Sequence, residues 1–269
     1  MVRTDGDSWD IVSSVGLTAL WVAMFRALET AADPSSLNNT PFFPGFMGVR
    51  TKFYDEFFLS AAAAGASGAV LLAAGLDALP YRLDWPSGTT VFEVDQPKVL
   101  EFKQEVLDQH GASTKTERRS VSVDLRDDWP AALEAEGFDP VKPTAWSAEG
   151  LLPYLPGIAH DLLFERIDAL SVRGSHLAVD NFVAGADTQR FATITSKYFG
   201  QSVFGDIDVS ALLFDDERAE PAQCLTEHGW SVTRVNPFEL AVVFGRPVEE
   251  LPAELATMMN QAMYVTAVK

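Results

Sequence analysis

The feature that most constrains the fold is a pair of apolar strands joined through a glycine turn, between residues 69 and 95. The first run, residues 69–74, leads into a turn that contains Gly75 and Asp77, and the second, residues 89–94, ends at Asp95. A buried strand, a tight glycine turn and an acid about 20 residues further on are typical of the nucleotide-binding half of a doubly wound sheet. There the acid accepts hydrogen bonds from ribose hydroxyls, and small turn residues let a ligand approach the backbone.

The turn also bears on which ligand could bind. Its sequence, A-A-G-L-D, has one glycine and an acid two residues later, in place of G-x-G-x-x-G. A dinucleotide pyrophosphate is held by bare N–H groups at a helix N-terminus, and the Asp77 carboxylate would repel it. S-adenosylmethionine, which carries a sulfonium and an ammonium, is a better match. A strand–turn–helix without any ligand stays open as the alternative.

Composition limits the class of protein. With 269 residues and 47% hydrophobic content, the chain can form one large domain or a domain with an added cap. Its net charge of -18 argues against nucleic acid or an anionic membrane as a partner, although it could serve solubility alone. No apolar run is long enough to span a membrane, and the first ten residues lack the pattern of a signal peptide. Cys224 is the only cysteine, so we expect a cytoplasmic protein without disulfides or bound metal.

Apolar and amphipathic segments alternate from residue 69 onward, which predicts a mostly parallel sheet with helices on both faces. The expected strands are residues 69–74, 89–94, 117–123, 144–148 and 175–181. The expected helices are residues 11–31, 50–64, 97–109, 130–136, 158–171, 189–199 and 220–228. We expect residues 230–235 and 240–244 to close the sheet as an antiparallel pair, followed by a terminal helix at 251–268.

No repeat or clean boundary divides the chain, so we expect one domain over residues 1–269. Its expected parts are an N-terminal helical extension (1–66), a cofactor-binding core (67–182), a cap-like insertion (183–218) and C-terminal strands and helix (219–269). Residues 33–48 are rich in Pro, Gly and Asn and predict a loop. The aromatic residues Phe42, Phe43 and Phe46, with the segment 198–204, could line an acceptor pocket or pack as an ordinary buried loop.

Each of the first four predicted strands of the sheet ends in a carboxylate. These acids are Asp77, Asp95, Asp124 and Glu149. Ligands bind beyond the carboxyl ends of parallel strands, and four acids meeting there are costly unless the ligand brings hydrogen-bond donors or positive charge. S-adenosylmethionine brings ribose hydroxyls, an amino group, an ammonium and a sulfonium. A solvated strand end explains any single acid, but four in register favour a ligand.

Arg50 is an isolated cation in an apolar, aromatic segment just before the sheet. An arginine can hold a carboxylate through two parallel hydrogen bonds, and the methionine part of S-adenosylmethionine has such a carboxylate. The alternative is a helix-surface ion pair with Asp55 or Glu56.

Taken together, the motifs resemble a known family over about residues 10–246. The segments in question are R-T-K-F-Y-D-E-F-F, L-L-A-A-G-L-D-A-L-P-Y-R-L, V-F-E-V-D-Q-P, V-D-L, A-E-G-L-L-P-Y-L-P and C-L-T-E-H-G-W. They resemble S-adenosylmethionine-dependent methyltransferases of actinobacterial (mycobacterial) type, relatives of the leucine carboxyl methyltransferases. The resemblance implies an α/β class I methyltransferase fold. That fold is a Rossmann-like, doubly wound seven-stranded sheet with an antiparallel last strand and added N-terminal and cap helices.

The resemblance also implies roles for individual residues. Arg50 would hold the cofactor carboxylate, Gly75 would lie under the methionine part and Asp95 would bind the ribose. Asp124 and Leu125 would frame the adenine, and Glu149 would face the methionine ammonium. The chain departs from the family at Ala73, where glycine is usual, at Leu79, where arginine is common, and at Pro80. An alanine at position 73 narrows the backbone approach and puts cofactor affinity in question.

The relatives favour oxygen acceptors, so we expect O-methylation of a carboxylate or hydroxyl on a small molecule, which depends mainly on alignment of the acceptor with the methyl group. None of the four histidines, His110, His160, His176 and His228, is identifiable as a base. Tyr154, in the loop after the fourth strand, is the candidate acceptor-side residue, with core packing as its alternative. A non-catalytic homologue or sensor that only binds S-adenosylmethionine stays open, and an NAD-dependent dehydrogenase is disfavoured by the turn sequence.

Overall fold

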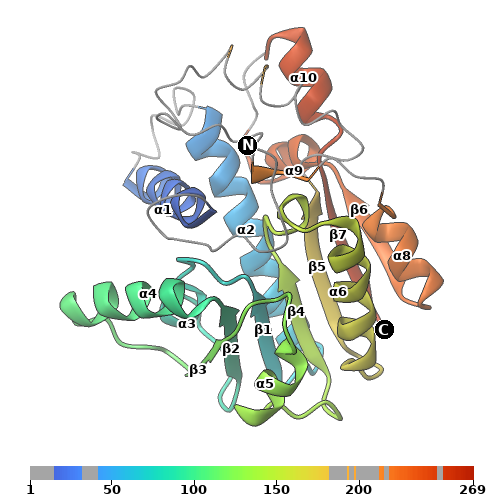
Figure 1. Ribbon diagram of the computed structural model, residues 1–269. Helices are drawn as coiled ribbons and strands as arrows, with labels where there is room; N and C mark the ends of the chain where they lie inside the picture. The colour runs from blue at the N-terminus through green and yellow to red at the C-terminus, as the bar shows by residue number, and fades with distance from the viewer. Residues whose placement is uncertain are drawn as a thin grey trace.

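Seven strands form one mixed sheet in the order β3-β2-β1-β4-β5-β7-β6 within the part of the chain that the structure describes (Figure 1). The computed structural model describes residues 15–31, 42–181, 193, 197, 212–214, 218–246 and 251–269. The strands are β1 (Gly68–Leu72), β2 (Thr90–Asp95), β3 (Glu117–Ser122), β4 (Thr144–Ala148), β5 (His176–Asn181), β6 (Ser231–Val235) and β7 (Met263–Val268). Strands β1 to β5 pair in parallel, and β7 is antiparallel to both β5 and β6. The predicted doubly wound sheet with an antiparallel last strand is confirmed.

Helices cover both faces of this sheet. They are α1 (Val15–Ala31), α2 (Phe42–Ala63), α3 (Leu79–Arg82), α4 (Pro97–Gln109), α5 (Trp129–Ala135), the 3₁₀ turn η2 (Leu152–Tyr154), α6 (Gly157–Ala169), α8 (Pro221–Glu227), α9 (Pro237–Val243) and α10 (Ala253–Met259). Helices α5, α6 and α8 pack on one face, and α2, α3 and α9 pack on the other. Figure 1 shows α1 beside the upper, N-terminal part of α2.

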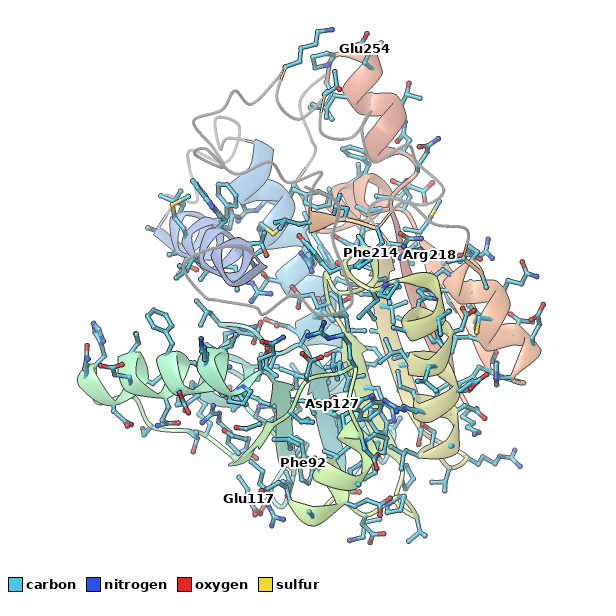
Figure 2. All side chains as sticks on the ribbon, viewed as in Figure 1. Phe92, Glu117, Asp127, Phe214, Arg218 and Glu254 are labelled. Atoms are coloured by element: carbon cyan, nitrogen blue, oxygen red, sulfur yellow. The ribbon has the colours of Figure 1, made fainter. Side chains whose placement is uncertain are left out.

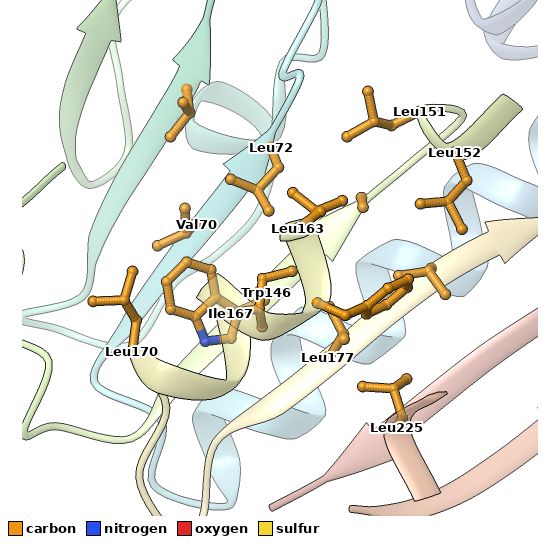
Figure 3. Close-up of a cluster of buried hydrophobic side chains, with 14 of the residues drawn as sticks. Val70, Leu72, Trp146, Leu151, Leu152, Leu163, Ile167, Leu170, Leu177 and Leu225 are labelled. Atoms are coloured by element: carbon orange, nitrogen blue, oxygen red, sulfur yellow. The ribbon is translucent and has the colours of Figure 1, made fainter. Parts of the chain in front are cut away.

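The central strands β1, β2, β4 and β5 are mostly apolar because both of their faces are buried, whereas the edge strands β3 and β6 are largely exposed. In β1, Val70 and Leu72 point into one core cluster, whereas Ala69 and Leu71 point into the other. The larger cluster is centred on the fully buried Trp146 of β4, as Figure 3 shows. This packing holds the strand ends rigidly, so the loops that leave them start from fixed positions.

The C-terminal prediction is wrong in two places. Residues 240–244 lie in and just after helix α9 rather than in a strand, because the Asn236 side chain accepts the Phe238 N–H at 2.8 Å and Pro237 occupies the first turn. Residues 251–268 are also not one helix: α10 ends at Met259, and residues 263–268 form β7. Tyr264 of β7 packs in one core cluster and Val265 in the other, so β7 shows the alternation of a buried strand.

The predicted loop at 33–48 ends earlier than expected, because α2 already begins at Phe42. A proline in the first turn of a helix lacks only an N–H that has no partner within the helix, so Pro44 does not prevent this start. Gly48 is needed where α1 crosses α2: a Cβ placed there would lie 2.8 Å from the Glu29 side chain. Phe46 is buried, while the side chains of Phe42 and Phe43, the segment 198–204 and most of residues 183–218 lie outside the described residues.

No described helix is long and apolar enough to cross a membrane. No group of three or more His, Cys, Asp or Glu side chains in the described ranges is arranged to hold a metal ion.

Candidate functional site

The glycine turn and the acid of the second strand are joined directly. The Gly75 N–H donates to Asp95 Oδ2 at 2.6 Å, and the Gln96 N–H donates to Asp95 Oδ1 at 2.7 Å. Both oxygens of Asp95 are therefore oriented by the backbone, and each keeps a further lone pair that a ribose hydroxyl could use. Burial raises the pKa of the Asp95 carboxyl to about 6 from its ordinary 3.8, although these two hydrogen bonds act against the rise.

Ala73 lies in the left-handed backbone region with φ +55°, alone among the described non-glycine residues. This conformation costs an L-residue about 1 kcal/mol or more, which is the physical reason why a glycine would be favoured here. The chain keeps the turn geometry despite its alanine, and Gly75 also has a positive φ of +51°. Ala73 and Leu125 both pack against the edge of the larger core cluster, so the alanine methyl group is accommodated.

Asp124 extends this group of residues along the edge of the sheet. It accepts the Gln96 side-chain N–H at 3.0 Å, and Arg126 donates to both of its oxygens, at 3.0 Å from Nε and 2.8 Å from Nη2. Gln96 thus connects Asp124 to Asp95, which accepts the Gln96 backbone N–H. The four predicted cofactor residues on this side, Gly75, Asp95, Asp124 and Leu125, are brought together.

The two remaining acids, Asp77 and Glu149, are bridged by a residue that the sequence analysis did not single out. Arg26 of α1 donates from Nη1 to Asp77 Oδ2 and from Nη2 to Glu149 Oε1, both at 2.5 Å, and from Nε to Thr51 Oγ1 at 3.1 Å. Burial disfavours ionisation of Asp77, but the nearby Arg26 and Arg82 outweigh it and hold the pKa of Asp77 below its ordinary value.

Arg50 lies deeper, under Glu149. Its Nε is 3.1 Å from Glu149 Oε1 and 2.8 Å from Asp180 Oδ2. The alternative of a surface pair for Arg50 is wrong, since Asp55 pairs with Arg82 and Glu56 pairs with Lys52.

Asp180, at the end of β5, is completely buried and accepts the Gly150 N–H at 2.5 Å through its other oxygen. Burial raises the pKa of Asp180 to about 6 against the opposing effect of Arg50. Asp180 therefore fixes both the guanidinium of Arg50 and the loop that follows β4.

Two buried tyrosines complete this region. The hydroxyls of Tyr54 on α2 and Tyr264 on β7 are buried and have no hydrogen-bond partner among the described residues. Burial, followed by the charges of Asp180 and Glu149, raises the pKa of Tyr54 well above its ordinary value, so this phenol is a donor. Buried donors without partners normally require an explanation such as a bound group. With Arg50 they form a donor set that suits a carboxylate, so these residues fit the methionine end of S-adenosylmethionine.

Sequence reasoning missed Arg26 and Asp180, although each carried a signal. Arg26 is an isolated cation in an apolar helix, which is the feature that identified Arg50. Asp180 lies at the end of the fifth strand, just as the other acids lie at or just after the ends of the first four strands. The strand-end pattern therefore extends to a fifth acid. What the sequence could not supply was the distance that makes Arg26 bridge two loops.

The loop after β4 carries the predicted acceptor-side residue Tyr154, which is half-buried at the end of η2. The described part of the expected cap packs here: the Phe214 N–H donates to Pro153 O at 3.0 Å, and Arg218 Nη1 donates to Leu152 O at 2.7 Å. Figure 2 shows Phe214 and Arg218 close together above α6. The acceptor role of Tyr154 stays a prediction.

The four histidines are spread over different elements of the fold. His176 opens β5 at the opposite end of that strand, and His160 is completely buried in α6. His110 and His228 follow the last residues of α4 and α8.

Comparison with known proteins gives the family. A sequence model described as leucine carboxyl methyltransferase matches residues 8–168. A protein of Rhodococcus jostii RHA1, named as a candidate S-adenosyl-L-methionine-dependent methyltransferase, is 62% identical over 100% of both chains. This chain belongs to the leucine carboxyl methyltransferase family. A similarly named protein from Mycobacteroides abscessus is 46% identical over 99% of this chain and 96% of its own. The reaction is therefore S-adenosylmethionine-dependent methyl transfer.

Solved structures support the fold of this methyltransferase. A crystal structure of a candidate methyltransferase from Thermobifida fusca YX aligns with a TM-score of 0.56 at 18% identity, covering 92% of this chain and 94% of that one. Magnesium protoporphyrin IX methyltransferase from Synechocystis PCC 6803, solved with S-adenosylhomocysteine, aligns with a TM-score of 0.54 at 13% identity, covering 97% and 96%.

Replacing Gly150 by alanine should displace Arg50. Gly150 has φ +63°, and a Cβ there would lie 2.5 Å from Arg50 Nη2. We expect Gly150→Ala to lose about 1–3 kcal/mol of stability and at least about tenfold in S-adenosylhomocysteine affinity, measured by denaturation and calorimetry. Gly111→Ala is the matched control, because Gly111 also has φ +63° but open space around it. Equal affinity in both variants would contradict the role given to Arg50.

Binding of S-adenosylhomocysteine should weaken as the pH falls through 6. Ribose hydroxyls donate to the ionised form of Asp95, whose pKa is about 6, and protonation removes an acceptor. The affinity should fall by at most about tenfold per pH unit below that value and level off above it. In Asp95→Asn, binding should be weaker and this pH dependence should disappear. A slope that persists in the variant would assign the titration to another group, such as Asp180.

Proposed function

We propose that this methyltransferase transfers the methyl group to an oxygen of a small molecule in the cytosol, a carboxylate first and a hydroxyl second. The observation that carries the proposal is the connected network at the carboxyl edge, in which Asp95 binds the glycine turn and Arg50 binds Glu149. The family description, which names a carboxyl group, supports an oxygen acceptor. A carboxylate is already ionised at neutral pH and needs no base, whereas a hydroxyl benefits from one.

The proposed cofactor site follows the two halves of this network. Arg50, with the phenols of Tyr54 and Tyr264, would hold the methionine carboxylate. Glu149 and Asp77 would face the ammonium. Gly75, in the turn that begins at Ala73, would lie under the methionine part. Asp95 would accept the ribose hydroxyls, and Asp124 with the Leu125 backbone would frame the adenine.

When bound, S-adenosylmethionine supplies a methyl group on a cationic sulfur, and the new O–C bond forms as the C–S bond breaks, with its electron pair left on sulfur. The residues of the chain contribute position and charge. Asp180 fixes Arg50 and the Gly150 N–H, and this sets where the loop with Tyr154 begins. Such alignment of the reacting groups is the main source of acceleration that a methyltransferase needs. A carboxylate acceptor would release no proton, whereas a hydroxyl acceptor would release one.

The test is transfer of a radiolabelled methyl group from S-adenosylmethionine to a panel of small carboxylic acids and alcohols. Methyl esters release volatile methanol in mild alkali and methyl ethers do not, so alkali-labile label identifies a carboxylate acceptor. Asp95→Ala should abolish the transfer. Asp84→Ala, at a carboxylate that is 94% exposed, should leave it unchanged. Binding of S-adenosylhomocysteine without transfer to any acceptor would contradict the proposal and favour a non-catalytic homologue or sensor.

A further inference from the structure

Arg26 forms ion pairs with Asp77 and Glu149, the two acids that the proposed function assigns to the ammonium of the cofactor. The inference rests on that assignment. The Arg26 guanidinium lies 2.5 Å from Asp77 Oδ2 and 2.5 Å from Glu149 Oε1. Helix α1, which carries it, comes close to the glycine turn: a Cβ placed on Gly75 would lie 3.6 Å from the Ala19 Cβ. A cation of the chain thus stands at the position where a cation of the ligand is expected.

An ammonium beside Glu149 would be the third positive charge at this carboxylate. Oε1 of Glu149 already contacts both Arg26 Nη2 and Arg50 Nε. Burial and the charge of Arg50 lower the pKa of Arg26, but the charges of Glu149 and Asp77 outweigh them and raise it overall. Arg50 is buried and also tied to Asp180, whereas Arg26 is on the outer helix α1 and half-buried. If the ammonium binds, Arg26 is therefore the cation that moves.

The structure contains a place for the displaced side chain. Arg26 borders a cavity of about 410 Å³ between α1, α2 and the end of α9, which Glu29 and Asp55 also line. Glu29 Oε2 and Asp55 Oδ1 are buried and accept no hydrogen bond from the described residues. Burial raises the pKa of Asp55, and the charges of Arg82 and Arg26 oppose this, so Arg26 already interacts with that carboxylate.

The movement requires no release of the helix. The other oxygen of Glu29 pairs with Arg246 beyond α9, and Gly48 lets α1 lie directly on α2. The C-terminal half of α1 is therefore anchored, so we expect the Arg26 side chain to rotate while the helix stays in place.

We propose that Arg26 is a placeholder for the ammonium of S-adenosylmethionine, which holds Asp77 and Glu149 in the free protein. On cofactor binding its guanidinium turns into the adjoining cavity, toward Glu29 and Asp55. In the free protein, Arg26 neutralises the negative charges of Asp77 and Glu149. Because it has to be displaced, the cofactor binds more weakly than it would to a site without Arg26. When only a fraction of the molecules has the site open, the measured affinity equals the affinity of the open site multiplied by that fraction.

The test is the affinity for S-adenosylhomocysteine, measured by calorimetry in a set of variants. Arg26→Met should bind about threefold to tenfold more tightly, because no placeholder has to leave. Arg26→Lys, with one ammonium and a shorter reach, should be intermediate. Glu29→Gln should bind more weakly, because the displaced guanidinium loses its partner, but should have no effect when combined with Arg26→Met. Arg246→Met is the matched control, since it breaks the same ion pair but leaves Glu29 free to receive Arg26.

Weaker binding by Arg26→Met would overturn the inference, because it would mean that Arg26 contacts the ligand directly. Equal effects of Glu29→Gln on the affinity with and without Arg26 would show that Glu29 does not receive the displaced guanidinium. Loss of affinity in Arg246→Met would assign the effect of Glu29→Gln to the stability of α1. Asp95→Ala separates this proposal from the assignment of the cofactor site. If Asp95→Ala abolishes binding while Arg26→Met does not tighten it, only the placeholder is wrong. If Asp95→Ala binds as well as the wild type, both are wrong.

Discussion

The arrangement depends on compensating carboxylates that the fold forces out of water. Parallel strands deliver Asp77, Glu149 and Asp180 to one edge of the sheet, and the effective penalty of burying an unpaired carboxylate is several kcal/mol. Arg26 and Arg50 supply the compensation, and each of them contacts two acids. Because Arg50 comes from α2 and Arg26 from α1, the N-terminal helices are part of the candidate site rather than an addition to it. Acids that require positive charge are also suited to a ligand that carries an ammonium and a sulfonium.

The same edge collects several features that lower the stability of the fold. Asp95 and Asp180 have pKa values raised to about 6, so both are ionised at neutral pH at a cost that burial imposes. Ala73 holds a left-handed backbone conformation that a glycine would adopt without strain. The phenols of Tyr54 and Tyr264 lack partners among the described residues. Unfavourable features of this kind tend to collect at functional sites, where the surrounding packing maintains them.

The sequence was sufficient for the sheet from β1 to β5 and for the gathering of most of the candidate acids at one edge of it. Buried strands are continuous apolar runs, and the position of an acid at a strand end follows from chain order alone, so Asp95, Asp124 and Glu149 could be placed together. It was insufficient at the C-terminus, where an apolar run can be strand or helix and the Asn236–Pro237 cap decided for the helix. The pairing of Arg26 with two distant loops depends on how α1 crosses α2 at Gly48, and no pattern within α1 encodes that crossing.

The acid–arginine network at the carboxyl edge is the proposed cofactor site. A crystal structure of the protein with S-adenosylhomocysteine tests it most directly. We expect the ribose hydroxyls on Asp95, the carboxylate on Arg50, and the ammonium beside Glu149 and Asp77 with the Arg26 guanidinium turned away. A ligand bound elsewhere, or at this edge without contact to Asp95 and Arg50, would contradict it.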